Sequence, residues 1–241
     1  MAYKKPTQIT SWSFSRYSTY RQCPLKAKLK FIDKMEEPTN DAMARGAAIH
    51  DTCEKYLKGT VARMPAELKL FADDFKKLKA QYKKRVPAMV VEDMWAFTKD
   101  WDETRWNDWA NCWVRIKLDC AHFEDETTLV VTDFKTGKFR PDKNEEYMEQ
   151  LELYALAALL MYPEIEGLVV KPRLMYLDAG VIYPEPGDDE LVYTAKDIGR
   201  LQKLWAKRVR PMLNDKKFPP RANNFCSWCH FRKSNGGPCK F

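Results

Sequence analysis

Long hydrophobic runs are what this sequence most clearly lacks. No apolar stretch reaches the roughly 18 residues that a membrane-spanning helix requires. The longest, residues 151–163, is interrupted by Glu152 and ends at a proline. The first six residues, Met-Ala-Tyr-Lys-Lys-Pro, are polar and contain no apolar core of a signal peptide. We therefore expect a protein of the reducing cytoplasm that makes no use of a membrane.

Internal repeats and low-complexity tracts are also absent. The chain is 45% hydrophobic and 13% aromatic, which excludes a disordered chain and predicts a globular one. A length of 241 residues is enough to bury the core of one domain, with room for a small appendage.

The seven cysteines are poor candidates for disulfides in a reducing compartment and better candidates for metal ligands. Cys226 and Cys229 form a C-x2-C motif, and Cys239 follows in the same tail. Two thiolates at this spacing can bind one metal ion or cluster, because a tight turn brings their sulfurs together. A fourth ligand is then required, and the candidates are Cys23, His230, Cys53, Cys112 and Cys120.

Positive charge is concentrated at the C-terminal end. The chain carries a net charge of +7, but residues 196–241 alone carry +10, so the first 195 residues are at −3. A basic surface on a nearly neutral body attracts polyanions, above all nucleic acid. The predicted contacts are Lys203, Lys207, Arg208 and Arg210, although a solvated helix face would show the same charge run.

Hydrophobic periodicity predicts an α/β fold. A helix begins after Ser13, a plausible N-cap, and Cys23-Pro24 separates it from a second, basic helix. Further helices are expected over 45–57, 66–85, 145–162 and 195–213. Strands are expected over 88–97, 112–123 (ending near Asp119), 129–135 and 168–177, with a short hairpin arm over 181–193.

The stretch 129–137, Leu-Val-Val-Thr-Asp-Phe-Lys-Thr-Gly, has the strongest chemical character. A buried strand ends here with Asp133 and Lys135 two residues apart, so both side chains point to one face. A polar turn at 124–126 makes a hairpin that brings Asp119 towards Asp133. The group could bind a divalent metal and polarise a water or phosphate; a surface ion pair is the alternative.

Two helices carry further candidates. His50 lies beside the predicted buried stripe of the 45–57 helix, with Glu54 one turn later on the same face. A lone histidine in this setting is more often a hydrogen-bonded core residue than a ligand, and Glu54 could be only a surface charge. Gln150 and Tyr154 are also spaced by four residues and could face the end of the strand pair.

Taken together, these motifs resemble the RecB-like branch of the PD-(D/E)XK nuclease superfamily. The resemblance rests on Gly46-x3-His50, Asp119, the segment 133–137 and Gln150-x3-Tyr154. The early Ser-x-Ser and Cys-Pro motifs and the late C-x2-C…C resemble its iron–sulfur subgroup. That subgroup includes the exonucleases associated with CRISPR adaptation and many bacteriophage and recombination nucleases.

The resemblance implies a role for each matching residue. Mg²⁺ or Mn²⁺ would be bound by His50, Asp119, Asp133 and the Phe134 carbonyl. Lys135 would orient the attacking water or stabilise the transition state, and Gln150 and Tyr154 would position Lys135, the water or the DNA. A [4Fe–4S] cluster would be bound by Cys23, Cys226, Cys229 and Cys239, although the gap between the last two is longer than expected. Zinc is the alternative, with Cys23 or His230 as the fourth ligand.

The resulting prediction is one nuclease domain over 1–241. Its restriction-endonuclease-like core of a mixed sheet flanked by helices covers about 41–195, and a cluster subdomain combines about 11–35 with 214–241. We expect a metal-dependent DNA exonuclease acting on single strands or ends, in a bacterial or phage-infected cell, with possible recombination or replication partners. The alternatives are a non-catalytic nucleic-acid-binding module with a zinc-bound tail, and a nuclease-fold protein with a structural role in such a complex.

Overall fold

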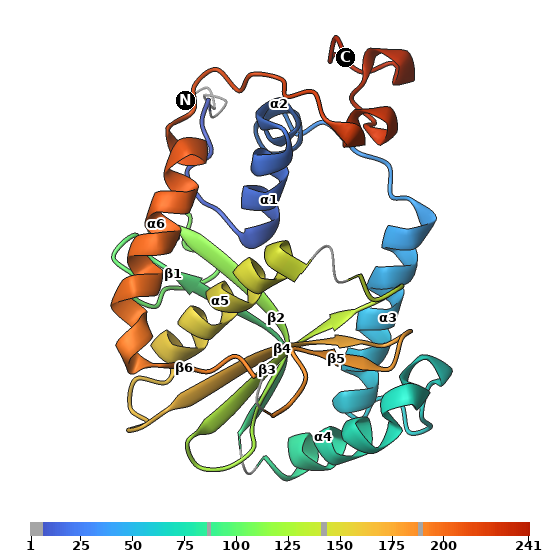
Figure 1. The fold of residues 1–241 in the computed structure, drawn as a ribbon, viewed down its shortest axis with the longest axis vertical. Coiled ribbons are helices and arrows are strands. Elements are labelled where there is room, and N and C mark those ends of the chain that lie inside the picture. Colours follow the sequence, from blue (N-terminus) through green and yellow to red (C-terminus); the bar gives the residue numbers. More distant parts are fainter. Residues whose placement is uncertain (1–6, 86–87, 141–143, 188–189) are drawn as a thin grey trace.

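A computed structural model describes residues 7–85, 88–140, 144–187 and 190–241. For residues 144 and 145 it describes the backbone only. Its centre is one mixed six-stranded sheet (Figure 1). The strands are β1 (Met89–Phe97), β2 (Val114–Phe123), β3 (Thr128–Lys135), β4 (Val169–Tyr176), β5 (Val181–Tyr183) and β6 (Tyr193–Thr194). They run in the order β1-β2-β3-β4-β5, with β6 also on β4. Only β3 and β4 pair in parallel. The predicted mixed sheet is confirmed.

Helices cover both faces of the sheet. They are α1 (Phe14–Gln22), α2 (Pro24–Ala27), α3 (Asp41–Leu57), α4 (Ala72–Lys84), α5 (Asn144–Met161) and α6 (Ile198–Asn214). Short 3₁₀ or π segments occupy Lys28–Ile32, Ala66–Phe71, Ala195–Asp197, Asn224–Trp228 and Lys233–Asn235. Residues of α5 and α6 share one apolar core with the sheet, and residues of α3 and α4 share a second. The α/β class with flanking helices is therefore confirmed.

Three predicted elements differ in the structure. Residues 66–71 form a 3₁₀ turn, so the predicted 66–85 helix becomes regular only at Ala72. Strand β2 does not end near Asp119 but continues to Phe123, because that segment pairs with both β1 and β3. The arm at 181–193 is not a hairpin. Its two ends, β5 and β6, pair with opposite ends of β4. The edge of β4 that faces away from β3 is long enough to accept both.

The N-terminal segment is fixed to the sheet by Trp12. Its amide donates to the Trp113 carbonyl at 2.8 Å, and its ring stacks on Trp205 of α6 at 5.4 Å between centroids. Trp12 is fully buried. The predicted N-cap of α1 is present, because the Ser13 hydroxyl accepts from the Arg16 amide. These contacts fix the segment before α1 against the start of β2 and against α6.

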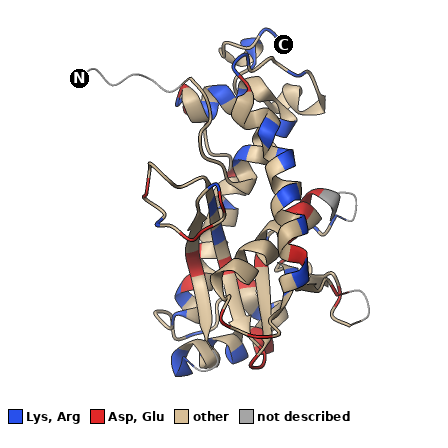
Figure 2. Cartoon of the chain, turned by 90° about the vertical axis from the view of Figure 1, so that its left-hand side faces the viewer, with Lys and Arg blue, Asp and Glu red and all other residues tan. Residues whose placement is uncertain are grey.

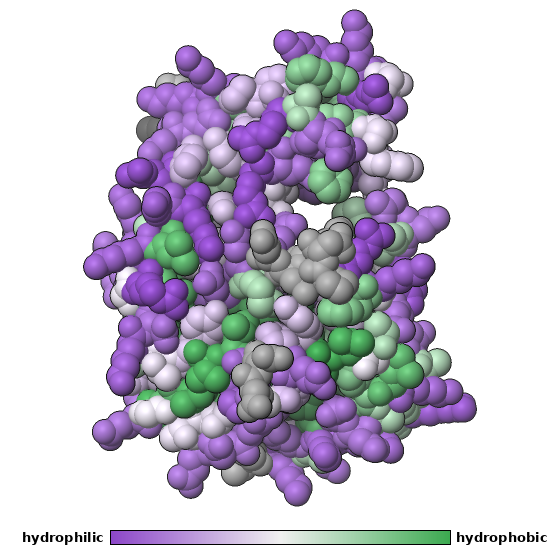
Figure 3. Space-filling view, in the orientation of Figure 1, coloured by the Kyte–Doolittle hydropathy of each residue, from purple (hydrophilic) through white to green (hydrophobic). Residues whose placement is uncertain are grey.

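The two terminal segments meet at one end of the molecule (Figure 1). The Asn223 side-chain amide donates to the Gln22 carbonyl at 2.9 Å, and the Arg221 guanidinium donates to the Arg21 carbonyl. The Arg221 amide also donates to the Cys23 sulfur at 3.4 Å. The space-filling view shows an opening between this end and the rest of the molecule (Figure 3). Among the described residues, no helix has the length and apolarity needed to cross a bilayer.

His122 on β2 gives the fold a dependence on pH. It is buried, and burial first and the charge of Arg173 second lower its pKa to about 4. In the unfolded chain its pKa returns to about 6.5, so between these values the unfolded state binds more protons. The fold is thus penalised progressively as the pH falls below about 6.5.

We expect this penalty to remove about 2 kcal/mol of unfolding free energy between pH 7 and pH 5. Urea denaturation of the wild type and of His122→Gln at both pH values measures the contribution of His122. The other titrating groups are the same in both proteins, so their contributions cancel in the difference of unfolding free energies. The difference in unfolding free energy should move in favour of His122→Gln at pH 5. A difference that stays constant with pH would contradict this origin.

Candidate active site

Three side chains from α3, β1 and β2 converge at the middle of the β1–β2 strand pair. The ligand atoms of His50, Glu92 and Asp119 all lie within 4.8 Å of one another. His50 Nδ1 is 3.1 Å from Asp119 Oδ1 and 3.9 Å from a Glu92 oxygen. Among the described residues, no other group of three or more His, Cys, Asp or Glu side chains is this compact. The arrangement offers one nitrogen and two carboxylates to a cation.

The convergence depends on an interruption of the β1–β2 ladder. Val91 pairs with Cys120 and Asp93 with Leu118, which leaves Glu92 opposite Asp119. Glu92 has φ +52°, a left-handed conformation that is unusual for a residue with a side chain. Like charges directly across a strand pair are destabilising. Two nearly buried carboxylates in this position therefore indicate a site that is shaped for a counterion.

Asp119 is fixed from two sides. Its Oδ2 accepts from the Phe134 amide of β3 at 2.7 Å, while its Oδ1 faces His50. Burial and the charge of Asp133 raise the pKa of Asp119, against the opposing effect of His50. For His50, burial lowers the pKa, but the hydrogen bond and charge of Asp119 outweigh it and the net pKa is raised. Negative charge thus dominates this position, and a bound cation would relieve it.

Asp133 and Lys135 form a second group beside the first. Lys135 Nζ lies 2.6 Å from Asp133 Oδ2 and donates to Gln150 Oε1 at 3.0 Å. The Asp133 Oδ1 accepts from Gln150 Nε2 and from the Tyr154 hydroxyl, both at 3.2 Å. Gln150 Nε2 is also 2.7 Å from that hydroxyl. Gln150 and Tyr154 of α5 therefore orient Asp133 and Lys135 at the end of β3. The four-residue spacing of Gln150 and Tyr154 predicted that both would face this end of the strand.

Lys135 is a partly buried ammonium held in its charged form. Burial lowers its pKa, but the charge of Asp133 and the ion pair with it outweigh burial and raise it. Its Nζ also lies 4.4 Å from the centre of the Tyr147 ring, a cation–π contact. A group in this state is a cationic hydrogen-bond donor and not a general base. It is suited to stabilising negative charge on a phosphate.

Gly46 sets the distance between α3 and the strand end. A Cβ at this position would lie 3.4 Å from the Thr136 hydroxyl, so the helix packs tightly against the turn after β3. Asp178 ties the same turn to α3, because it accepts from the Gly137 amide and forms a bidentate pair with Arg45. His50 follows Gly46 by about one helical turn and so faces Asp119. In the Gly46-x3-His50 motif, the glycine therefore allows α3 to pack closely on the turn after β3, and the histidine one turn later lies next to Asp119.

The four predicted cluster ligands line one cavity of about 230 Å³ between the terminal segments. They are Cys23, Cys226, Cys229 and Cys239. The amide of Asn223 donates to the Cys226 sulfur at 3.3 Å, as the Arg221 amide does to Cys23. The other candidates, Cys53, Cys112, Cys120 and His230, are not among the residues that line it.

Of the predicted nucleic-acid contacts on α6, Arg208 is engaged within the molecule. Its guanidinium pairs with Glu152 at 2.6 Å and with Glu149 at 3.5 Å, so it joins α6 to α5. Lys203, Lys207 and Arg210 are exposed. In the view from the α6 side, basic positions recur along the molecule up to the C-terminal segment (Figure 2).

Glu92 is the site residue that the sequence interpretation did not identify. It lies within a segment that was expected only to be a strand, and sixteen residues separate β1 from β2. Lys117 was also missed; its ammonium lies 2.5 Å from the second Glu92 oxygen. Glu54, by contrast, pairs with Lys58 at 2.7 Å and is a surface charge of α3. The sequence signal that could have identified Glu92 is its position as a carboxylate directly after the apolar run Met89–Val91.

Glu92→Gln is expected to weaken Mn²⁺ binding about 10–100-fold, because a carboxylate ligand loses its charge. Isothermal titration calorimetry with Mn²⁺ measures this directly. Glu54→Gln is the matched control, since Glu54 lines the same pocket without belonging to the converging group. Equal weakening in both variants would assign the effect to general electrostatics and contradict the role of Glu92.

Comparison with known proteins now places the chain in a family. Residues 11–234 match the model of the PD-(D/E)XK nuclease superfamily, and the chain belongs to that superfamily. Its fold is similar to the crystal structure of a candidate exonuclease from Eubacterium rectale, with 12% identity, TM-score 0.50, and coverage of 92% of this chain and 87% of the other. SSO0001 is a more distant structural match, with 14% identity, TM-score 0.43 and coverage of 100% and 91%. No match is found among curated proteins.

Proposed function

We propose that the chain is a Mg²⁺- or Mn²⁺-dependent DNA exonuclease that hydrolyses single strands or DNA ends. The observation that carries the proposal is the meeting of Glu92, Asp119 and Asp133 on three neighbouring strands, next to the partly buried ammonium of Lys135. Membership of a nuclease superfamily supplies the reaction class and implies a nucleic-acid substrate.

The residues present fit a hard divalent cation. Carboxylate oxygens are the preferred ligands of Mg²⁺ and Mn²⁺, and imidazole is compatible with Mn²⁺. We assign His50, Glu92 and Asp119 as ligands, and retain Asp133 and the Phe134 carbonyl as predicted ones. A cation bound here would neutralise charge on the scissile phosphate and lower the pKa of an attacking water.

The remaining side chains orient and compensate. Lys135 donates to a non-bridging phosphate oxygen or to the water, where negative charge develops in the transition state. Gln150 holds Lys135 through its carbonyl oxygen and Asp133 through its amide nitrogen. Tyr154 keeps its proton, since burial and the charge of Asp133 raise its pKa well above the usual value. It therefore acts as a hydrogen-bond donor to Asp133 and positions that carboxylate.

We further propose that Cys23, Cys226, Cys229 and Cys239 bind a [4Fe–4S] cluster that joins the two terminal segments. The four sulfurs line one cavity, and backbone amides donate to two of them, Cys23 and Cys226, as amides do to metal-bound thiolates. Zinc on the same four thiolates is the alternative.

The binding-module alternative differs in what its acidic residues do. It assigns Glu92, Asp119 and Asp133 only to ion pairs with Lys117, His50 and Lys135. It gives no reason for His50, Glu92 and Asp119 to converge within 4.8 Å of one another, an arrangement that suits a metal ion. The exposed lysines of α6 would contact DNA in either case, and recombination or replication proteins are the proposed partners.

Digestion of linear and circular single strands tests the proposed function. Purified protein with Mn²⁺ should release mononucleotides or short oligonucleotides from a linear strand and leave a circle of the same sequence intact. Cleavage of the circle would replace the exonuclease assignment by an endonuclease one. Absence of release from every DNA and RNA substrate, with binding retained, would favour the binding module.

A further inference from the structure

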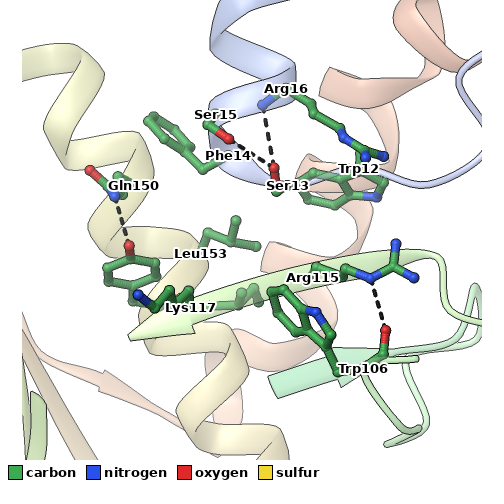
Figure 4. Close-up of a pocket in the computed structure, with 12 residues that line it drawn as sticks. Trp12, Ser13, Phe14, Ser15, Arg16, Trp106, Arg115, Lys117, Gln150 and Leu153 are labelled. Atoms are coloured by element: carbon green, nitrogen blue, oxygen red, sulfur yellow. Dashed lines mark hydrogen bonds between the residues drawn. The ribbon is translucent and has the colours of Figure 1, made fainter. Parts of the chain in front are cut away.

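A cavity of about 340 Å³ opens beside the candidate active site, between the start of α1 and the surface of β2 (Figure 4). Its volume is in the lower part of the roughly 300–1,000 Å³ that small-molecule sites occupy, so it has room for one nucleotide. Its walls include Ser13, Ser15 and Phe14 from α1 on one side and Arg115 and Lys117 from β2 on the other. Of the residues given a role in catalysis above, only Gln150 and Tyr154 line this cavity.

Two arginines without acidic partners line the cavity. Arg16 Nη1 and Arg115 Nη1 both donate to the Ser11 hydroxyl at 3.0 Å, which places the two guanidinium groups close together. Among the described residues, neither arginine forms an ion pair, and Arg115 is only 9% exposed. Burial and then the charge of Arg115 lower the pKa of Arg16. A partly buried pair of like charges is costly unless an anion compensates it.

The start of α1 adds to the positive character of this wall. The first turn of this nine-residue helix contains no acidic residue, although acidic side chains are favoured there by the helix dipole. The hydroxyls of Ser13 and Ser15 are hydrogen-bonded to each other at 3.0 Å and line the cavity. Guanidinium groups, hydroxyls and a helix N-terminus are together the donor set that proteins use for phosphate.

Aromatic rings flank the arginine pair. Arg115 lies 5.8 Å from the Trp106 ring and 4.7 Å from the Trp109 ring, and its Nε donates to the Trp106 carbonyl at 3.0 Å. Trp106 lines the cavity, and Trp109 is 81% exposed next to it. Stacking of a base on an exposed indole stabilises single-stranded nucleic acid without sequence preference. Trp109 lies outside the hydrophobic core, so its exposed ring can offer such a surface.

The cavity shares lining residues with the candidate catalytic site. Gln150 and Tyr154, which hold Asp133, form its opposite wall, and Figure 4 shows Gln150 across the cavity from Arg16 and Arg115. Lys117 lines both this cavity and the pocket of His50, Glu92 and Asp119. A strand with its scissile phosphate at the acidic residues can therefore place a neighbouring nucleotide here.

We propose that this cavity binds a nucleotide of the substrate strand next to the scissile bond, with its phosphate on Arg16 and Arg115 and its base against Trp106 and Trp109. The inference rests on the proposed nuclease function and extends it by naming a substrate subsite. The phosphate is either an internal diester or a terminal monoester, and the second source would make the site a reader of strand ends.

Fluorescence anisotropy in EDTA tests the subsite without requiring catalysis. The probes are labelled oligothymidylates carrying a 5′-phosphate, a 3′-phosphate or hydroxyls at both ends, each measured over a series of salt concentrations. Arg16→Gln should weaken binding about 5–10-fold and lower the slope of log affinity against log salt by about 1, because one phosphate contact is lost. Lys77→Gln, an exposed lysine of α4, is the matched control and should change neither quantity.

The probes distinguish the two phosphate sources. Loss of affinity confined to an end-phosphorylated probe identifies a terminal monoester, and equal loss on all three identifies an internal diester. Wild-type affinity and salt slope in Arg16→Gln would overturn the subsite, even if Mn²⁺-dependent cleavage is found. If Arg16→Gln lowers the affinity and the salt slope as expected but the wild-type protein cleaves no substrate, only the proposed function is overturned.

A second measurement serves if Arg16→Gln does not fold, as judged by circular dichroism. Thymidine 5′-monophosphate should raise the Tm of the wild-type protein and compete with the oligonucleotide, because it carries both the base and the phosphate. Thymidine alone should do neither at the same concentration. Equal effects of the two compounds, or none from either, would overturn the subsite.

Discussion

Lys135→Ala is expected to slow phosphodiester hydrolysis by about 10²–10³-fold, with little change in DNA affinity. The magnitude is that of removing one preorganised donor from a transition-state oxyanion. The ammonium is already held beside Asp133 and Gln150, so no reorganisation is needed when charge develops. Initial rates with Mn²⁺ and anisotropy in EDTA separate catalysis from binding.

Two further variants make the Lys135 result interpretable. Lys138→Ala removes an exposed lysine three residues later and should retain wild-type rates. Lys135→Met keeps the length of the side chain without its charge, so it should be as slow as alanine if the ammonium is responsible. A rate within about threefold of wild type in both Lys135 variants would contradict a catalytic role for Lys135.

Cys23→Ser is expected to remove most of the bound iron and the broad absorbance near roughly 400 nm that thiolate-bound iron–sulfur centres show. A cluster that joins the two terminal segments also supplies folding free energy to the tail, as structural metals do. We therefore expect a fall in Tm and faster proteolysis of the segment after α6. Anaerobic purification, iron and sulfide analysis and limited proteolysis measure these effects.

Cys112→Ser is the matched control for the cluster. Cys112 is a buried free thiol near the N-terminal segment, but it does not line the cavity of the four cysteines. Its thiol donates to the Val114 carbonyl at 3.6 Å, a contact that a hydroxyl can replace. Iron content should stay at the wild-type level in this variant. Colourless wild-type protein with one equivalent of zinc would contradict the [4Fe–4S] assignment.

Local sequence signals predicted most of the sheet and its helices. The run Leu129–Val131 before Asp133, and the apolar face of α5, define their elements without help from the rest of the chain. The failures depend on distant partners. Whether 181–193 folds on itself or along β4 is decided by the free edge of β4, which no local pattern encodes.

The site was predictable where its residues stand at fixed spacing on one element. Asp133 and Lys135 share a strand end, and Gln150 and Tyr154 share a helix face. Glu92 was not predictable, because its role depends on strand register and on a left-handed backbone at one residue. Arg16 and Arg115 likewise meet only because Trp12 anchors the start of α1 on β2.

The most direct test of the central claim is nucleotide release by metal-stripped protein from a uniformly labelled linear single strand. The account predicts no release in EDTA, release on addition of Mn²⁺ or Mg²⁺, and none from Asp119→Asn under the same conditions although that variant still binds the strand. Release that persists in EDTA, or equal release by Asp119→Asn, would contradict a metal-dependent nuclease centred on Asp119.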